Sequence, residues 1–171
     1  MPNEIAAENL MLIVDESPGT RRAVDYVTKM LGCHRGIHVY LLQLLPPLPA
    51  ELLEFGGAED PRQEQQLQSN LHRDQQAWIA AAKAPARKVI DEAVATLRGA
   101  GLFTYEIELA SSDPLDDRDP AIGLLKQAHE KHCHTIVVGN HTPPWFRKLT
   151  GVPLPEHLLR HAADIAFWIV P

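Results

Sequence analysis

Three positions that could contact a ligand, Asp15, Gln43 and Gly139, each lie at or near the end of a short apolar run. The runs span residues 10–14, 38–45 and 135–139. Continuous apolar runs of this length are typical of strands buried on both faces of a parallel sheet. Ligands of such sheets bind beyond the carboxyl ends of the strands, where the strand order reverses. The spacing therefore predicts a binding edge that gathers these three residues.

A second group of residues has side chains that could bind a metal ion. His129, His132, Cys133 and His134 lie within six positions, and nitrogen and sulfur ligands of this kind suit zinc. However, Cys133 directly precedes an apolar run, where a small buried residue is expected, and neighbours in an extended chain point to opposite faces. We therefore expect no metal site here. The aspartates between Asp113 and Asp119 lack the ligand spacing of a calcium loop, and Asp-Pro helix or turn starts explain them more simply.

Catalytic motifs are missing from the chain. The sequence contains no GxxxxGK[ST] loop, no G-x-S-x-G elbow and no H-E-x-x-H helix. We therefore expect a protein that is not an enzyme, with weak ATPase activity as the only enzymatic alternative.

The elements that must position the candidate residues alternate between strands and helices. Strands are expected at 10–14, 38–45, 103–109, 135–139 and 165–170. Helices are expected near 23–31, from Asp60-Pro61 to Gly99 with a kink at Pro85, after Asp119-Pro120, and at 156–161. This order predicts an α/β fold, a five-stranded, mostly parallel open sheet with helices on both faces, similar to a Rossmann fold. Residues 1–171 would form one domain, with an inserted loop and a long kinked helix at about 46–99.

Composition and charge narrow the possible partners. The 171 residues carry 16 Lys plus Arg against 22 Asp plus Glu, a net charge of −6, which argues against general binding to nucleic acid or an anionic membrane. No run approaches the ~18 apolar residues of a spanning helix. Residues 1–4 carry no features of a secretory signal, and two cysteines make no disulfide framework. We expect a cytoplasmic protein.

Several motifs, taken in order, resemble those of the universal stress protein family. They are Ile13-Val14-Asp15-Glu16-Ser17, an Arg-Arg-Ala helix, Asp-Pro-Ala-Ile before a helix, Thr-Ile-Val-Val-Gly-Asn-His, and Leu158-Leu159-Arg160-His161-Ala162 before a closing apolar strand. The resemblance covers nearly the whole chain. It implies a fold that binds ATP or AMP in one subgroup and no nucleotide in another.

The resemblance also implies a role for individual residues of a nucleotide site. Asp15 would meet the ribose and phosphates, and Gln43 and Leu44 would lie against adenine. Val138 and Gly139 would lead into a loop of the form Gly-x-x-Gly, nine residues, then Gly-Ser or Gly-Thr, whose N–H groups hold the phosphates. Asp15 has an alternative role as a cap of the following helix or turn.

The phosphate loop of this sequence departs from that pattern. Thr142 stands where the second glycine belongs, and Pro143-Pro144 follow it. Gly151 comes after eight residues rather than nine and is followed by Val152-Pro153 instead of a hydroxyl residue. Proline lacks an N–H donor, and threonine disfavours the positive φ of a glycine turn. We predict a degenerate loop and weak or absent ATP binding, so that no cofactor is expected; the alternative is an ATP or AMP switch with slow or no hydrolysis.

Two further features of the binding edge leave alternatives open. His141 could meet a phosphate or be a histidine of the rim. Arg147-Lys148 could bind a phosphate or an acidic partner, or simply be solvated.

The last strand carries the features of a subunit interface. Its apolar residues are Ile165, Phe167, Trp168 and Ile169. A long apolar edge strand is prone to aggregate unless it is paired or covered. Members of the universal stress protein family commonly pair this strand across a two-fold axis, so the resemblance implies a homodimer that acts through other protein partners.

Overall fold

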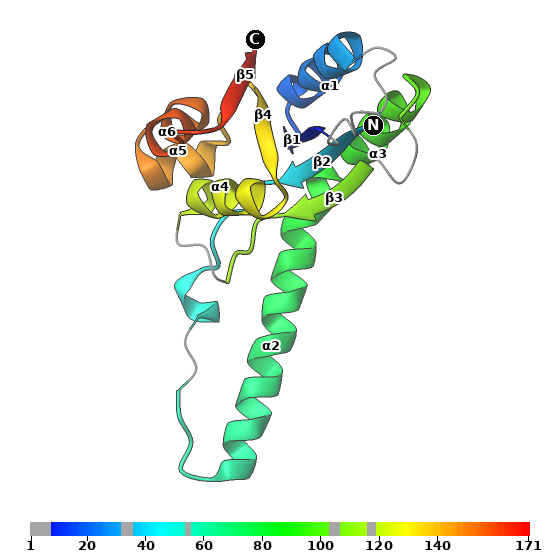
Figure 1. Ribbon diagram of the computed structural model, residues 1–171. Coiled ribbons are helices and arrows are strands. Elements are labelled where there is room, and N and C mark those ends of the chain that lie inside the picture. The colour runs from blue at the N-terminus through cyan, green and yellow to red at the C-terminus, as the bar shows by residue number, and fades with distance from the viewer. Residues whose placement is uncertain (1–7, 32–35, 54–55, 103–106, 116–118) are drawn as a thin grey trace, which may run out of the picture.

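The molecule is a parallel sheet of five strands with helices on both faces, as the sequence predicts (Figure 1). The computed structural model describes residues 8–31, 36–53, 56–102, 107–115 and 119–171. The strands are β1 (Glu8–Val14), β2 (Ile37–Gln43), β3 (Ile107–Ser111), β4 (Cys133–Gly139) and β5 (Ala166–Val170). Their order is β3-β2-β1-β4-β5, and every neighbouring pair is parallel. The strand order therefore reverses beside β1, between β2 and β4.

Successive side chains of a strand point to opposite faces of the sheet, so the core is divided into two layers. Leu10, Leu12 and Val14 of β1 pack toward α1 (Pro18–Leu31) and α3 (Arg87–Gly99). Met11 and Ile13 pack toward α4 (Pro120–Glu130), α5 (Pro144–Thr150) and α6 (Leu154–His161). Because both faces of β1 are covered from Leu10 onward, residues 10–14 are all apolar and buried.

Local capping signals fix two of the helix starts. Asp60 accepts a hydrogen bond from the Arg62 N–H at the start of α2 (Pro61–Lys83), and Asp119 accepts one from the Ala121 N–H at the start of α4. In each helix the next residue is a proline, which has no N–H to leave unsatisfied. The long helix is interrupted at Pro85, as predicted, by the short 3-10 helix η2 (Ala84–Ala86).

Several expected boundaries were wrong. The second strand ends at Gln43 rather than at residue 45, and the third is shifted to Ile107–Ser111; Phe103 and Tyr105 lie outside the described residues. Helix α6 begins at Leu154, not at 156. Helix α5 was not predicted, because Pro143-Pro144 were expected to belong to the phosphate loop.

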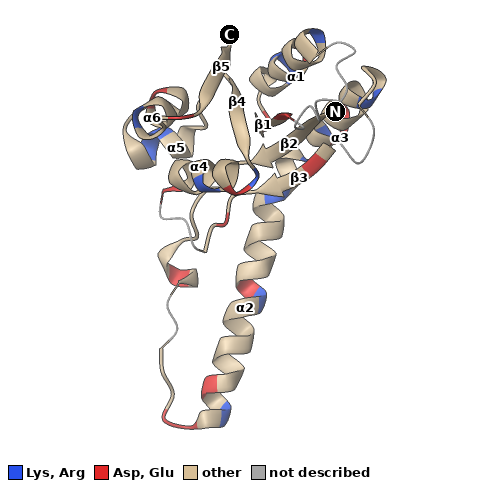
Figure 2. Ribbon diagram, in the orientation of Figure 1, with Lys and Arg blue, Asp and Glu red and all other residues tan. Residues whose placement is uncertain are grey.

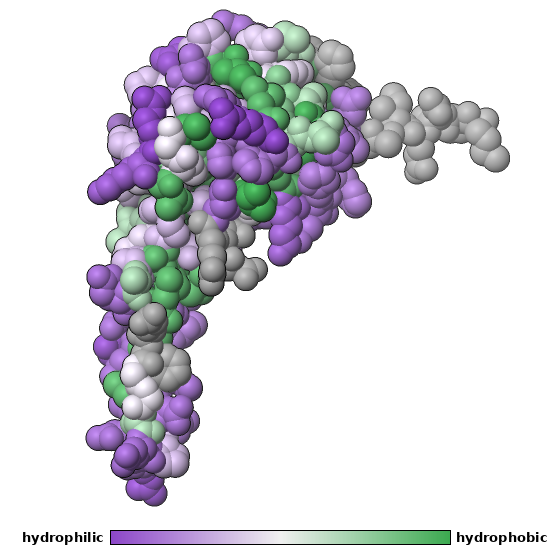
Figure 3. Space-filling model, turned by 90° about the vertical axis from the view of Figure 1, so that its left-hand side faces the viewer, coloured by the Kyte–Doolittle hydropathy of each residue, from purple (hydrophilic) through white to green (hydrophobic). Residues whose placement is uncertain are grey.

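Helix α2 projects away from the sheet (Figure 1). We call α2 together with residues 50–53 and 56–60 the arm; these residues include a short 3-10 helix, η1 (Ala50–Leu52). None of the 23 residues of α2 is buried. In a space-filling view, apolar side chains are exposed along the arm (Figure 3). Leu53 and Leu67 are both exposed large apolar residues. Within the described part of the chain, no helix is both long and apolar enough to cross a bilayer.

Phe146 is the buried anchor of helix α5, and Trp145 beside it packs against the same layer of the core. Phe146 is fully buried among residues of α4 and α6, whereas Leu149 on the same helix is 47% exposed. We expect Phe146→Ala to lower the free energy of unfolding by about 3–5 kcal/mol, because it leaves a cavity in the core. Leu149→Ala is the matched control and should change it by less than about 1 kcal/mol. Urea unfolding followed by circular dichroism measures both, and equal effects of the two changes would contradict this packing.

Candidate functional site

The carboxyl ends of β1, β2 and β4 border a cavity of about 220 Å³. Three of the predicted residues, Asp15, Gln43 and Leu44, line it, and so does His141. The remaining wall comes from the junction of α2 with α3, at Ala82, Pro85 and Ala86, and from Pro143, Pro144 and Trp145. The cavity lies where the strand order reverses, which is the expected ligand position for an open α/β sheet.

Asp15 acts as the cap of the turn that begins α1. Its Oδ1 accepts hydrogen bonds from the Ser17 N–H at 2.9 Å, from the Ser17 hydroxyl, and from the Thr20 hydroxyl at 2.8 Å. The Asp15 N–H donates in turn to Thr20 Oγ1 at 2.9 Å. One carboxylate oxygen is thus fully used within the chain, which is the capping role considered above. A role for Asp15 in nucleotide binding stays a prediction.

Gln43 ties the end of β2 to the end of the arm. Its side chain is almost fully buried, and its amide lies 3.3 Å from the Lys83 carbonyl and 3.5 Å from the Ala82 carbonyl, to which it donates. Leu44, the next residue, is also buried. The polar group expected to face a ligand is therefore engaged with the helix that forms the opposite wall of the cavity.

Because Gly139 has no side chain, the backbone at the end of β4 can contact the backbone of α1 at Gly19. A Cβ atom at this position would lie 2.9 Å from the carbonyl carbon and oxygen of Gly19, in the first turn of α1. Val138 beside it is buried in the core. Both line a second, much smaller cavity of about 10 Å³. A water molecule needs at least that space, so this part of the site is essentially filled by the protein itself.

The loop after β4 uses its backbone donors internally. The Asn140 N–H donates to the Val170 carbonyl at 2.6 Å, and the His141 N–H to the Gly139 carbonyl at 2.7 Å. The hydroxyl of Thr142 accepts a hydrogen bond of 3.0 Å from the Leu154 N–H, the first of α6. In a helix that binds an anion, the N–H groups of the first turn would face the ligand.

Gly151 ends helix α5 rather than lining either cavity. Its φ of 77° lies in the left-handed region, and its N–H donates to the Arg147 carbonyl at 2.9 Å. Glycine is favoured at this position because a Cβ would be strained there. An open groove of about 670 Å³ lies between α5 and the loop and is lined by Asn140, His141, Thr142, Pro144, Arg147, Lys148 and Pro153.

The histidines and cysteine considered as metal ligands do not converge. Burial raises the pKa of the Cys133 thiol to about 11, so the thiol remains protonated near neutral pH. The Nδ1–H of His129 donates to the Leu125 carbonyl at 2.7 Å, and its Nε2 faces Asp164 at 3.1 Å. These two partners raise the pKa of His129. Over the described ranges, no group of three or more His, Cys, Asp or Glu residues is arranged to hold a metal ion.

Residues 7–170 match the family model described as the universal stress protein family. The chain belongs to the universal stress protein family. No curated protein matched the sequence, but solved structures share the fold. A universal stress protein from Burkholderia pseudomallei has 18% identity and a TM-score of 0.61, with 96% of each chain covered. A universal stress protein in complex with cAMP has 18% identity and a TM-score of 0.56, covering 97% of this chain and 98% of its own.

A third universal stress protein structure, from Archaeoglobus fulgidus and in complex with dAMP, has 15% identity and a TM-score of 0.54. The match covers 96% of this chain and 98% of the other. At this level of identity the likeness establishes the shared fold.

The close contact between Gly19 and Gly139 in this universal stress protein can be tested by substitution. We expect Gly139→Ala to destabilise the protein by about 1–3 kcal/mol, because the new methyl group meets the Gly19 backbone and β4 or α1 must shift. Gly99→Ala is the control, since a Cβ there meets nothing within 4 Å. Thermal unfolding compares the two; a Gly139→Ala protein as stable as the wild type would show that the contact is not tight.

Proposed function

We propose that this universal stress protein is a non-enzymatic, cytoplasmic stress-response protein that acts as a dimer through protein partners and binds ATP weakly or not at all. The observation that carries the proposal is the hydrogen bond from the Leu154 N–H to the Thr142 hydroxyl. It gives the first donor of α6 a partner inside the protein.

The rest of the helix start supports the same conclusion. Pro155 has no N–H, and the His157 N–H is bonded to the Pro153 carbonyl. Glu156 places a carboxylate in the first turn of α6, where it interacts favourably with the helix dipole and would repel a second anion. A triphosphate at this position would have to displace the Thr142 hydroxyl and approach the Glu156 carboxylate.

A second candidate function is an adenine-nucleotide switch that binds a smaller ligand such as AMP, with slow or no hydrolysis. The cavity of about 220 Å³ favours it, because its apolar wall at Leu44 and Pro46 could face a base. Arg147 and Lys148 line the neighbouring groove and could neutralise one phosphate. Two structures of the same fold carry cAMP and dAMP.

Calorimetric titration with ATP tests the proposal. We expect no saturable binding with a Kd tighter than about 1 mM, because the loop donors are already bonded. The mass spectrum of small molecules released from denatured purified protein should contain no stoichiometric nucleotide. Stoichiometric ATP bound with micromolar affinity would contradict the proposal.

Titration with AMP and cAMP separates the two candidates. If either binds, Asp15→Ala should weaken it, whereas Asp25→Ala, an exposed aspartate on α1, should not. An unchanged affinity in the Asp15→Ala protein would leave Asp15 with its capping role alone.

The proposed dimer uses β5, which lies at one edge of the sheet and, among the described strands, pairs only with β4. Phe167 and Trp168 are half-buried against the two layers of the core, and Trp168 packs edge-on against Tyr26 at 5.9 Å between ring centroids. Ile169 is 42% exposed. Antiparallel pairing of two β5 strands would continue the sheet across a two-fold axis and bury these residues.

Sedimentation equilibrium tests the β5 interface. We expect Ile169→Asp to weaken dimerisation at least about tenfold, because it places a charge in an apolar contact between strands. Leu149→Asp is the matched control, since Leu149 on α5 is 47% exposed and lies on no part of β5. An unchanged dimer in the Ile169→Asp protein would place the interface elsewhere.

A further inference from the structure

The cavity beside β1, β2 and β4 is lined by two carboxylates and by no lysine or arginine of the described residues. The carboxylates belong to Asp15 and Glu16. Three hydrogen bonds use Oδ1 of Asp15, whereas no described group bonds its Oδ2. Glu16 is exposed, and neither residue takes part in an ion pair of the described part of the chain. A ligand that enters this cavity therefore meets two negative charges that no neighbouring cation neutralises.

The other walls of this cavity suit the stem of a long cationic side chain. They are apolar and are formed by Leu44, Pro46, Ala82, Pro85, Ala86, Pro143, Pro144 and the half-buried Trp145. Arginine and lysine pack their methylene stems along apolar surface and keep the charged end in a polar environment. A guanidinium group also stacks on aromatic rings, and tryptophan is the best partner for it. The combination of apolar walls, a tryptophan and two carboxylates favours an arginine side chain.

The size of the cavity agrees with a single inserted side chain. Pockets that enclose a whole drug-sized ligand have about 300–1,000 Å³, and this cavity has about 220 Å³. Its far wall is closed, because the almost fully buried Gln43 donates its amide to the Lys83 carbonyl. A ligand that fills this space must therefore leave most of its bulk outside.

A groove of the opposite charge adjoins the cavity. It is the groove of about 670 Å³ beside α5, which is lined by Arg147 and Lys148 and shares His141 and Pro144 with the cavity. No described aspartate or glutamate lines it, and neither cation is in an ion pair of the described residues. Acidic residues mark the turn between β1 and α1, and basic residues mark α5 (Figure 2). The two hollows therefore attract the opposite ends of a dipolar ligand.

We propose that the cavity and the groove together bind a segment of a partner protein in which an arginine lies close to an acidic residue. The arginine side chain enters the cavity along Trp145 and meets Asp15 and Glu16. The acidic residue of the same segment meets Arg147 and Lys148 in the groove. Complementary charges of this kind select the partner and fix its orientation. The inference rests on the proposed function, in which this protein acts through protein partners.

Calorimetric titration with a short peptide tests the proposal. The test peptide is Gly-Asp-Ala-Arg-Ala-Asp-Gly with acetyl and amide ends, in which acidic residues on both sides serve either direction of binding. We expect saturable binding with a Kd tighter than about 1 mM. Citrulline in place of arginine keeps the shape and removes the charge, so it should weaken binding at least about tenfold. No saturable binding, or equal affinity of the citrulline peptide, would overturn the proposal.

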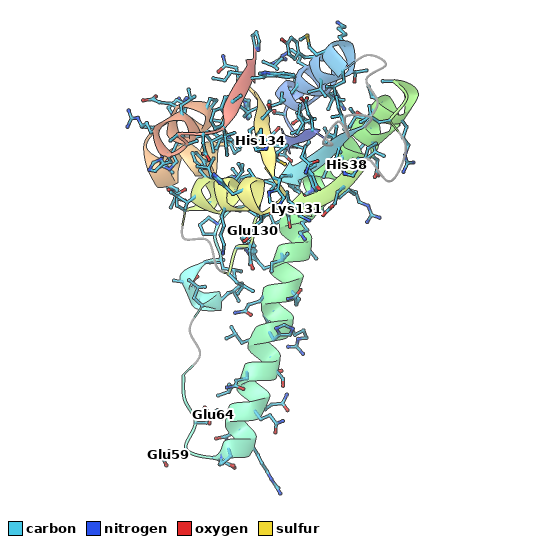
Figure 4. All side chains as sticks on the ribbon, in the orientation of Figure 1. His38, Glu59, Glu64, Glu130, Lys131 and His134 are labelled. Atoms are coloured by element: carbon cyan, nitrogen blue, oxygen red, sulfur yellow. The ribbon has the colours of Figure 1, made fainter. Side chains whose placement is uncertain are left out.

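Glu16→Gln tests whether the arginine enters the cavity. It should weaken binding of the test peptide about threefold to tenfold, but leave the citrulline peptide unaffected, because that peptide has no charge to lose. Glu130→Gln is the matched control and should change neither affinity. Glu130 is exposed at the end of α4, where the chain enters β4 at the opposite edge of the sheet (Figure 4). An equal loss with both peptides would overturn the placement of the arginine.

Arg147→Gln combined with Lys148→Gln tests the groove. The double variant should bind the test peptide about threefold to tenfold more weakly, and this effect should vanish with a peptide that carries asparagine in place of aspartate. Lys29→Gln with Arg98→Gln, two exposed cations on α1 and α3, is the control with the same change in net charge. Circular dichroism should show equal helix content in all variants. A double variant that binds the test peptide normally would overturn the dipolar segment.

Two further titrations separate this inference from other outcomes. Free L-arginine has the guanidinium and one carboxylate but no peptide chain, so it should bind at least about tenfold more weakly than the test peptide. Equal affinity would overturn a protein segment as the occupant. ATP bound with micromolar affinity would overturn the proposed function and this inference with it. A protein that binds neither ATP nor the test peptide would overturn this inference alone.

Discussion

The contact between the backbones of Gly19 and Gly139 fixes the geometry of the binding edge. It joins the first turn of α1 to the end of β4, directly beside the reversal of strand order. With this contact made, Asp15 is held against Ser17 and Thr20, and the loop after β4 must leave the sheet in one direction. In phosphate-binding loops, glycine lets a ligand approach the backbone closely. Here the space above Gly139 is taken by another part of the chain, so the glycine serves packing.

Two prolines at the starts of helices also shape the binding edge. Pro144 and Pro155 lie in the first turns of α5 and α6, where the missing N–H costs the helix nothing. The same missing N–H removes a donor from the place where phosphates would bind. Under the proposed function, the residues that give the loop its helical structure also lower its capacity to bind an anion, because the Thr142 hydroxyl accepts the hydrogen bond of the Leu154 N–H at the start of α6.

Features of the fold that depend on residues close together in the sequence could be predicted from the sequence. The five strands, the caps at Asp60 and Asp119 and the break at Pro85 all follow from local patterns. Helix α5 could not be predicted in the same way, because Phe146 finds its partners on α4 and α6. Of the three residues predicted to gather at the binding edge, Asp15 and Gln43 line one cavity together with Leu44 and His141, whereas Gly139 packs against Gly19 and lines only the smaller cavity.

The walls of that cavity illustrate what a sequence alone leaves undetermined. Ala82 and Pro85 line it beside the hydrogen bond by which Gln43 joins the end of α2 to β2, a contact between residues 40 positions apart. The predicted roles of Thr142 and Gly151 changed for a similar reason: each is used to begin or end a helix, and the identity of that helix depends on tertiary packing.

The proposed β5 dimer relies on apolar burial and backbone pairing, which salt affects little. Strand β5 pairs with β4, and the Asn140 N–H just after β4 donates to the Val170 carbonyl at the end of β5. The proposed interface is therefore joined directly to the loop that borders the binding edge.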